Sequence, residues 1–389
     1  MKIMVLNLGS TSFKYKLFDM EEGERVLSSG GVENIGAPQS PYRIRLPQEE
    51  RGEAPCPRHE DAFELCLQWM LRHGVLKDLS ELAAIGYKAV HGGALSGAQR
   101  VGEEVLAQME AHVSFAPAHN PMYLRMMRAM GERYPQVPQV ACFETAFHAT
   151  QPEYRAVYGV PYEWKQRYGV RRYGFHGSSH SYIAWKMQQD APECRRIISC
   201  HLGGSSSLCA IQDGKSIAAS MGATPQSGLF QNNRVGDFDV FCLPALAEKL
   251  GGMEQVLAAL SSQSGFLGLS GVSNDLREVE AAAQAGNARA QLSLDAFADN
   301  IVGYIGMYTA YLGGLDAVVF TGGIGLNSTV IRQAVCEKLG FAGAKLDAAA
   351  NVRGREGRMD APESRVQIWA LETNEELMVA RGTKACLGL

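Results

Sequence analysis

The chain begins with a strand, a short polar turn and a second strand. Residues 3–6 are an apolar run of strand length, and residues 13–18 alternate between Lys and large apolar side chains as a second strand would. The turn at residues 7–12 carries an amide, three hydroxyls and Gly9. Such a turn can hold a phosphate, although a polar hairpin turn that binds nothing is the alternative. Because a strand follows it where a helix would be needed, the turn is not a P-loop.

A second copy of this pattern lies about half a chain away. At residues 196–211 an apolar strand again leads into Leu-Gly, here with one extra glycine, then into three hydroxyls and a further apolar strand. Two matching hairpins at this spacing indicate an internal duplication. We therefore expect two related α/β domains that face each other across a cleft, with a phosphate-type turn in each.

Composition limits the class of protein. With 389 residues and 46% hydrophobic content, the chain is long enough for two ordinary domains. A net charge of -4 without blocks of like charge gives no reason to expect nucleic acid or a membrane as partner. Nine scattered cysteines, without a Cys-x-x-Cys pair, predict neither a disulfide framework nor a zinc site, so a reducing cytoplasm fits best. No apolar run approaches the roughly 20 residues of a membrane span.

Polar residues follow several predicted strands. The strand at residues 82–90 ends in His91-Gly92-Gly93, which makes Lys88 and His91 candidates for a ligand crevice. Another strand, at residues 137–143, ends at Glu144. Residues 171–180 combine two Arg, two His and two Gly without an acid, which favours an anion site over a plain surface loop. Within that segment, Ser178 or Ser179 is expected to cap a helix that runs to about residue 189.

The second half contains a long irregular stretch and a glycine-rich turn. Residues 221–239 hold Arg234, and long connections inside compact domains are often functional. The buried strand predicted at residues 317–321 opens into a Gly-rich turn at 322–328 and then a helix, an order that lets backbone approach a nucleotide. Apolar spacing and capping residues predict helices at residues 60–73, 276–285, 288–312 and 374–385.

Taken together, these motifs resemble the acetate kinase family over nearly the whole chain. The resemblance implies an α/β fold of two duplicated actin-like ATPase (ribonuclease H-like) domains, each with a mixed five-stranded sheet, and an interdomain cleft. The N-terminal domain would comprise residues 1–148 plus a C-terminal helix at 374–389, and a nucleotide-binding domain would comprise residues 149–373. The implied activity is reversible phosphorylation of a short-chain carboxylate to an acyl phosphate by a cytoplasmic homodimer that uses ATP and Mg²⁺.

The resemblance also implies roles for individual residues. The catalytic residues would be Glu144, His176 and Arg234. Mg²⁺ would be held by Asn7 and Glu375. The acceptor carboxylate would be bound by Lys88, Val90, Ala118, Phe175 and Pro225. The nucleotide would be bound by Ser10, Ser12, Lys14, His201, Leu202, Gly203, Gly204, Ser205, Asp275, Leu276, Arg277, Gly323, Ile324, Gly325, Leu326 and Asn327.

Several positions depart from the family pattern. Lys88 replaces an arginine, Glu144 replaces an aspartate, and Ala118 and Ala223 replace larger apolar residues. These four changes raise the alternative of a bulkier or differently functionalised carboxylate. The departures on the nucleotide side are Gly204 for an asparagine and Leu326 for a glutamate. They leave open a non-ATP donor such as pyrophosphate, or a nucleotide-binding sensor or scaffold that has lost transfer chemistry.

Overall fold

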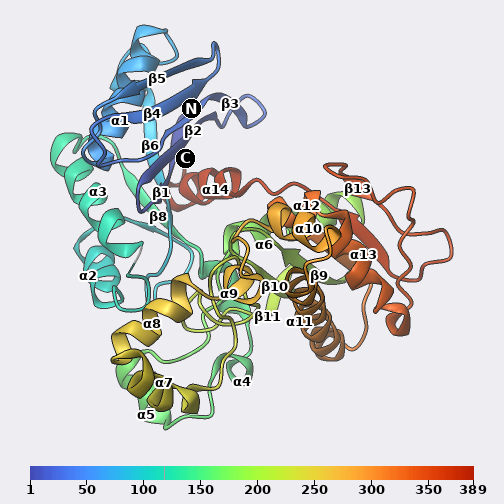
Figure 1. The fold of residues 1–389 in the computed structure, drawn as a ribbon. Coiled ribbons are helices and arrows are strands. Elements are labelled where there is room, and N and C mark those ends of the chain that lie inside the picture. Colours follow the sequence, from blue (N-terminus) through green and yellow to red (C-terminus); the bar gives the residue numbers. More distant parts are fainter. Residues whose placement is uncertain (118) are drawn as a thin grey trace. The chain divides into compact units, whose positions relative to one another are not determined.

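The computed structural model describes residues 1–117 and 119–389. Ala118, which the sequence predicts as an acceptor-binding residue, lies outside the described residues. The chain forms two compact units (Figure 1): unit 1 consists of Met1–Phe147 and Asn374–Leu389, and unit 2 of His148–Thr373. The last helix therefore returns to the unit in which the chain begins.

Unit 1 is built on an eight-stranded mixed sheet with the order β5-β4-β3-β2-β1-β6-β8-β7. In chain order, the strands are β1 (Lys2–Gly9), β2 (Ser12–Asp19), β3 (Arg25–Val32), β4 (Ser40–Arg45), β5 (Glu50–Ala54), β6 (Leu82–Ala89), β7 (Ala98–Arg100) and β8 (Gln139–Phe143). β1 pairs in parallel with β6, and β6 with β8, whereas the other neighbours are antiparallel.

Helices cover both faces of this sheet. α1 (His59–Arg72) and α3 (Asn120–Arg133), beside α2 (Glu103–Ala111), pack on the face that carries Leu6, Leu8 and Phe13. α14 (Glu375–Leu387) packs against β1 and β6 on the sheet. Gly86 of β6 permits this close packing, because a Cβ there would lie 2.3 Å from the Thr383 hydroxyl of α14. The helix also forms ion pairs, from Glu376 to Lys16 of β2 and from Arg381 to Glu24 in the turn between β2 and β3.

Unit 2 has a six-stranded mixed sheet with the order β11-β10-β9-β12-β14-β13. Its strands are β9 (Arg196–His201), β10 (Ser207–Gln212), β11 (Lys215–Ala219), β12 (Ala317–Thr321), β13 (Gly357–Arg358) and β14 (Gln367–Ala370). The long helix α11 (Ala288–Leu312) buries an apolar side against β9 and β10, and α6 (Gly177–Asp190) packs on β9. The remaining helices are α4 (Glu153–Ala156), α5 (Tyr162–Tyr168), α7 (Leu243–Leu250), α8 (Met253–Ser262), α9 (Gly265–Ser270), α10 (Leu276–Gln284), α12 (Gly322–Asn327) and α13 (Thr329–Glu337).

The two sheets repeat one plan. The run β3-β2-β1-β6-β8 of unit 1 corresponds to the run β11-β10-β9-β12-β14 of unit 2. In both, the first three strands are antiparallel neighbours and the last three are parallel neighbours. The predicted duplication is therefore confirmed, but each five-stranded core carries further strands: β4, β5 and β7 in unit 1, and β13 in unit 2.

Three local predictions differ from the structure. The first turn is much shorter than residues 7–12, because Asn7 and Leu8 continue the ladder opposite Lys14 and Phe13, which leaves two residues at the tip. Of the Gly-rich turn predicted at residues 322–328, residues 322–327 form the helix α12. Neither Ser178 nor Ser179 caps α6: both lie inside it, and His176 occupies the cap position.

Two further observations concern the chain as a whole. The nine cysteines are all free thiols, and seven of them are buried. Among residues 1–117 and 119–389, no helix combines the length and the apolar character needed to cross a membrane.

The contact between Gly86 and α14 gives a stability test. Gly86→Ala should lower the free energy of unfolding by about 1–3 kcal/mol, because the new methyl group would push against Thr383. The double variant Gly86→Ala/Thr383→Ala should recover most of that loss, as measured by urea unfolding. Gly159→Ala is the control, since no atom lies within 4 Å of a Cβ placed there and the residue lies outside helices and strands. Equal losses for the single and the double variant would contradict this account.

Candidate functional site

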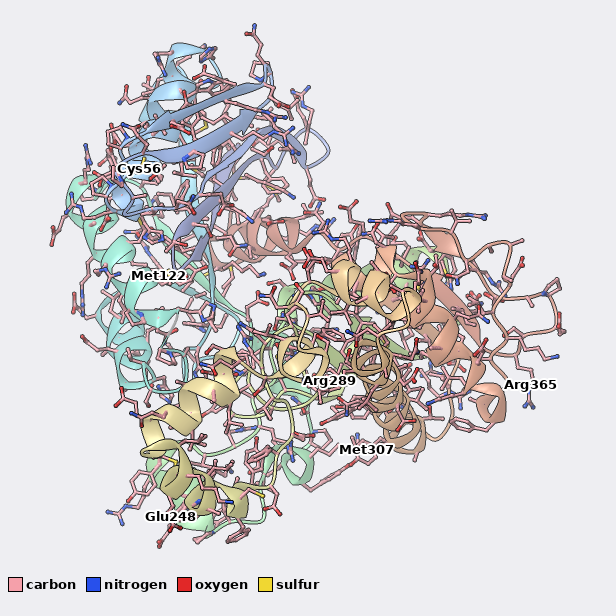
Figure 2. The ribbon with its side chains drawn as sticks, viewed as in Figure 1. Cys56, Met122, Glu248, Arg289, Met307 and Arg365 are labelled. Carbon is pink, nitrogen blue, oxygen red and sulfur yellow. The ribbon has the colours of Figure 1, made fainter. Side chains whose placement is uncertain are left out.

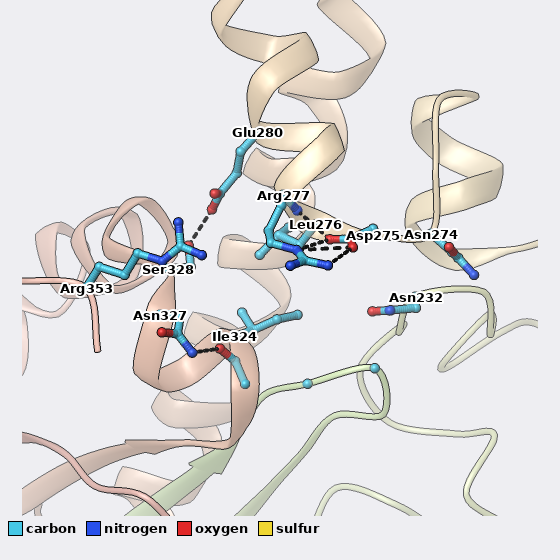
Figure 3. Close-up of a pocket in the computed structure, with 13 residues that line it drawn as sticks. Asn232, Asn274, Asp275, Leu276, Arg277, Glu280, Ile324, Asn327, Ser328 and Arg353 are labelled. Atoms are coloured by element: carbon cyan, nitrogen blue, oxygen red, sulfur yellow. Dashed lines mark hydrogen bonds and ion pairs between the residues drawn. The ribbon is translucent and has the colours of Figure 1, made fainter. Parts of the chain in front are cut away.

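A cavity of about 460 Å³ opens in unit 2 where loops meet the helices α10 and α12 (Figure 3). Its lining comes from the β9–β10 loop, the start of α10, the helix α12 and an irregular segment near residue 353. The lining residues are Gly203, Gly204, Asn232, Asn274, Asp275, Leu276, Arg277, Glu280, Gly323, Ile324, Asn327, Ser328 and Arg353.

Backbone hydrogen bonds around Leu202 form the base of this cavity. The Leu202 N–H donates to the Thr321 carbonyl at 2.8 Å, and the Leu202 carbonyl accepts from the N–H groups of Ile324 at 2.8 Å and Gly325 at 3.1 Å. Gly322 makes this approach possible: its φ is +77°, and a Cβ there would lie 2.6 Å from the Leu202 carbonyl oxygen. The β9–β10 loop and α12 are thus held together without side chains between them.

Paired charges form the opposite wall. Asp275 caps α10 by accepting from the Arg277 N–H at 2.9 Å, and the Arg277 guanidinium pairs with the same carboxylate. Glu280, one turn further along α10, accepts from the Ser328 hydroxyl at 2.5 Å. Arg353 also lines the cavity and forms no ion pair with any described residue. The wall therefore offers both cations for phosphates and carboxylates for hydroxyl or amino groups.

Eight of the predicted nucleotide-binding residues line the cavity, and several others do not. The eight are Gly203, Gly204, Asp275, Leu276, Arg277, Gly323, Ile324 and Asn327. Leu202 and Gly325 are buried below it, and Leu326 packs against the apolar core of unit 2. His201 and Ser205 make hydrogen bonds elsewhere, to Ser179 and Gln231.

Sequence reasoning missed five lining residues. Asn274 and Ser328 directly adjoin predicted segments, and Glu280 lies one helical turn after Leu276, so an extended motif and helical spacing would have found these three. Asn232 and Arg353 lie in irregular segments, and no sequence pattern marks them.

Arg234 is held beside the β9–β10 loop. Its Nη1 donates to the Ser205 hydroxyl at 3.3 Å, to the Gln231 side-chain oxygen at 3.2 Å and to the Pro225 carbonyl at 3.4 Å. Arg234 forms no ion pair with the described residues, and burial lowers the pKa of its guanidinium. Guanidinium groups nevertheless stay protonated in proteins. The structure therefore brings the predicted residues Ser205 and Pro225 into contact with the guanidinium of a third, Arg234. This guanidinium has no acid partner among the residues that the structure describes.

His176 lies at the start of α6 in an unusual backbone conformation. Its φ is +55°, in the left-handed region that few non-glycine residues adopt and that often marks functional positions. The ring stacks on His201 with centroids 4.2 Å apart, and its Nδ1 lies 2.8 Å from the Ser207 hydroxyl. Phe175 is buried, and its carbonyl lies 2.8 Å from the His148 Nε2. Two predicted residues of different roles, His176 and His201, are thus in direct contact.

The predicted site residues of unit 1 gather around Lys88. The Lys88 ammonium forms an ion pair with Glu375, the first residue of α14, and both side chains are largely buried. Burial opposes the charge, yet the nearby carboxylates of Glu375 and Glu144 hold the pKa of Lys88 above its usual value. Lys88, a predicted acceptor-binding residue, therefore lies close to the predicted catalytic residue Glu144 and the predicted metal-binding residue Glu375. Val90, also predicted to bind the acceptor, follows two residues later in the chain.

The other unit 1 candidates lie on the β1–β2 hairpin. Asn7 faces Lys14 across the hairpin ladder, and Lys14 is exposed and lies 3.7 Å from Glu33. Ser10 and Ser12 flank the tip. The described residues contain no group of three or more His, Cys, Asp and Glu side chains placed to hold a metal ion. Mg²⁺ commonly takes only one or two carboxylates, with phosphates and water as further ligands, so a single carboxylate such as Glu375 is compatible with the predicted role.

Comparison with known proteins extends over the whole chain. Residues 2–381 match the sequence model of the acetokinase family. An acetate kinase of Carboxydothermus hydrogenoformans is 45% identical over 98% of each chain, and a propionate kinase of Citrobacter rodentium is 43% identical over 98% of this chain and 95% of that protein. The crystal structure of Porphyromonas gingivalis acetate kinase matches with a TM-score of 0.91 at 38% identity, and 99% of each chain is covered.

The buried histidines of unit 2 predict loss of stability in acid. Burial lowers the pKa of His148 to about 4, whereas its pKa in the unfolded chain is near 6.5. Between pH 6.5 and pH 4 the unfolded chain therefore binds a proton that the folded protein excludes. The free energy of unfolding should therefore fall as pH drops, by about 2 kcal/mol at pH 5 from this group alone. Urea unfolding of wild type and His148→Gln at pH 7.5 and pH 5 would measure it. Parallel pH dependences of the two proteins would contradict the prediction.

Proposed function

The chain belongs to the acetokinase family, and from that premise we propose that it phosphorylates acetate or propionate reversibly, with nucleotide contacts in unit 2 and acceptor contacts around Lys88 in unit 1. Family membership makes it a phosphotransferase that uses ATP and a carboxyl acceptor, and it confirms the predicted fold class of two actin-like ATPase domains. The observation that carries the proposal is the match of residues 2–381 to one family, because it includes every predicted site residue.

The cavity of unit 2 supports ATP as the donor. Arg277 and Arg353 supply positive charge for phosphates, and Asp275 and Glu280 supply acceptors for ribose or base groups. A pyrophosphate donor would leave much of a cavity of about 460 Å³ unused, so we do not favour it. The absence of side chains at Gly203 and Gly204 in the β9–β10 loop would let a phosphate approach the backbone.

The chemistry at the acceptor requires charge neutralisation and no general base. A carboxylate with a pKa near 4 is already ionised at neutral pH, so its oxygen attacks without losing a proton. The obstacle is repulsion between two anions, and phosphoryl transfer then depends on positioning and on cations around the transferred group. Arg234 suits that role, because its Nε and Nη2 make no hydrogen bond with the described residues and remain available to an anion. His176 would add a further N–H donor.

We propose that Mg²⁺ is held by Glu375 and Asn7 together with nucleotide phosphates. When bound, the ion would neutralise charge on the phosphates and on the transferred group. Lys88 would then have to share Glu375 with the ion, while Glu144 would keep the Lys88 ammonium charged and in place. Glu144 thus acts in this proposal by orienting a cation and does not abstract a proton.

We also propose that the protein works as a homodimer in the cytoplasm. Large apolar side chains are exposed on unit 2, and exposed patches of this kind are typical of subunit contacts. They include Tyr154, Tyr162, Trp164, Tyr168 and, on α11, Met307 and Tyr311 (Met307 is labelled in Figure 2). Nine cysteines without a disulfide support a reducing compartment.

A catalytically silent sensor is not favoured. Such a protein would have little reason to hold Arg234 by three hydrogen bonds without an acid to neutralise it, or to keep His176 in a left-handed conformation. Both features carry a cost in stability that phosphoryl transfer would explain.

Removal of the Arg234 guanidinium should reduce kcat strongly. Arg234→Ala is expected to lower kcat by about 10²–10³-fold in acyl phosphate formation, because developing charge on the phosphoryl group would lose its arginine. Arg365→Ala is the matched control: Arg365, labelled in Figure 2, is exposed and is neither a predicted site residue nor part of the cavity lining. An equal loss of kcat in the two variants would contradict this role for Arg234.

The acceptor can be tested with a carboxylate panel. Acyl phosphate would be trapped with hydroxylamine from formate, acetate, propionate, butyrate and hydroxylated acids, for wild type and Lys88→Arg. We expect acetate or propionate to give the highest kcat/KM. Lys88→Arg should lower the acceptor KM by about tenfold, because arginine binds a carboxylate in a two-pronged contact.

The same exchange at an exposed ion pair, Lys338→Arg, controls for nonspecific effects. A higher kcat/KM for a bulkier acid would contradict the assignment of acetate or propionate as the acceptor. The kinase proposal would be refuted if none of the acids gave an acyl phosphate. An acceptor KM unaffected by Lys88→Arg would remove Lys88 from the acceptor site.

A further inference from the structure

His176 is the end of a chain of hydrogen bonds that runs into the interior of unit 2. Its Nδ1 lies 2.8 Å from the Ser207 hydroxyl oxygen, which also lies 2.8 Å from the Nε2 of His180. The Nδ1 of His180 lies 2.9 Å from the hydroxyl oxygen of Ser199. His180, Ser207 and Ser199 are each fully buried. Two serines and one histidine thus connect the β9 strand to the ring at the start of α6.

Burial restricts how protons can be arranged along this chain. Desolvation, with smaller effects from His148 and His201, holds the pKa of His180 well below its usual value, so the ring is neutral and carries one N–H. Ser207 has one proton and two ring nitrogens to satisfy, so it donates to one ring and accepts from the other. Only two arrangements make every contact a hydrogen bond.

The two arrangements differ at Ser199. In the first, Ser199 donates to His180 Nδ1, His180 Nε2–H donates to Ser207, and Ser207 donates to His176 Nδ1. In the second, every bond is reversed, and the Ser199 hydroxyl hydrogen would need another acceptor. Ser199 makes no other side-chain hydrogen bond with the residues that the structure describes. A buried hydroxyl hydrogen without an acceptor costs about 1–3 kcal/mol, so the first arrangement is favoured.

We infer that Ser199, His180 and Ser207 are positioning residues that keep the proton of neutral His176 on Nε2. In this arrangement Nδ1 accepts from Ser207, and Nε2 carries the ring's N–H, which points away from Ser207. This inference rests on the proposed function, in which His176 stabilises charge on the transferred phosphoryl group. The chain would supply that donor in advance, so no proton has to move when charge develops.

Unit 2 contains a natural comparison for this chain. His148 is also buried and also lies 2.8 Å from a serine hydroxyl, that of Ser216. Ser216 is not one of the three residues of the chain. Ser216→Ala therefore removes a buried hydroxyl–histidine bond of the same length without breaking the link between His176 and Ser199.

The tautomer of His176 can be measured without activity. Long-range ¹H–¹⁵N spectra of the full-length protein, labelled with ¹⁵N-histidine, report which ring nitrogen carries the proton, and the spectrum of His176→Gln assigns the signal. We expect the Nε2–H tautomer in wild type and in Ser216→Ala. Ser207→Ala and Ser199→Ala should each show a mixture with the Nδ1–H tautomer. A wild-type signal from Nδ1–H, or an unchanged tautomer in Ser207→Ala, would overturn the inference.

Kinetics provide the second readout. Ser207→Ala should lower kcat by about tenfold, the effect of one lost hydrogen bond at the transition state, with little change in the KM for ATP. Ser199→Ala, which does not touch His176, should lower kcat less, and Ser216→Ala should leave it unchanged. Equal losses in Ser207→Ala and Ser216→Ala would indicate a purely structural effect and count against the inference. Thermal unfolding of each variant shows whether it is folded.

The two proposals can fail separately. Wild-type protein that forms no acyl phosphate would refute the kinase function, whereas the tautomer of His176 would still be read from its spectrum. Active wild-type protein whose His176 carries its proton on Nδ1 would refute only the role of the hydrogen-bond chain.

Discussion

The cavity of unit 2 depends on how the Leu202 backbone joins two distant parts of that unit. β9 and β12 are more than a hundred residues apart in sequence, yet they pair in parallel, and Leu202 continues that pairing with one N–H and one carbonyl. The apolar side chain of Leu202 is fully buried, which fixes the direction of the loop that follows it. As a result, the glycines of the β9–β10 loop and the first turn of α12 line the same cavity. Because these hydrogen bonds involve only backbone atoms, the side chains that line the cavity can be substituted without removing them.

The same sheet plan serves two different purposes in the two units. In unit 1 the antiparallel hairpin has a two-residue tip, whereas in unit 2 five residues separate β9 from β10. The longer connection is what allows Gly203 and Gly204 to reach the cavity while Ser205 turns toward Arg234. The difference in loop length thus gives the unit 2 copy a loop that lines a cavity. The other copy instead places Asn7 within a regular ladder.

The elements that local patterns determine were predictable, and those that distant contacts determine were not. The bounds predicted for α11 and β12 agree with the structure. α11 is long and β12 is fully buried, and a glycine follows each of them directly, so local patterns mark where they end. The tip at residues 7–12 was predicted too long because Asn7 and Gly9 suggest a turn, whereas cross-strand pairing of Leu8 with Phe13 extends the ladder. For the site, family resemblance identified most of the lining, but Arg353 and Asn232 reach it only through tertiary packing. The hydrogen bond between His180 and Ser207 could not be predicted either, since it joins segments 27 residues apart.

The return of α14 to unit 1 has a consequence for synthesis on the ribosome. Unit 1 contains the first 147 residues, but the helix that covers β1 and β6 and supplies Glu375 belongs to the last 16. Those residues emerge only after all of unit 2 has been made, so the nascent N-terminal sheet must wait with one apolar face uncovered. Chains that stop before residue 374 would expose that face permanently and become targets for chaperones or proteases.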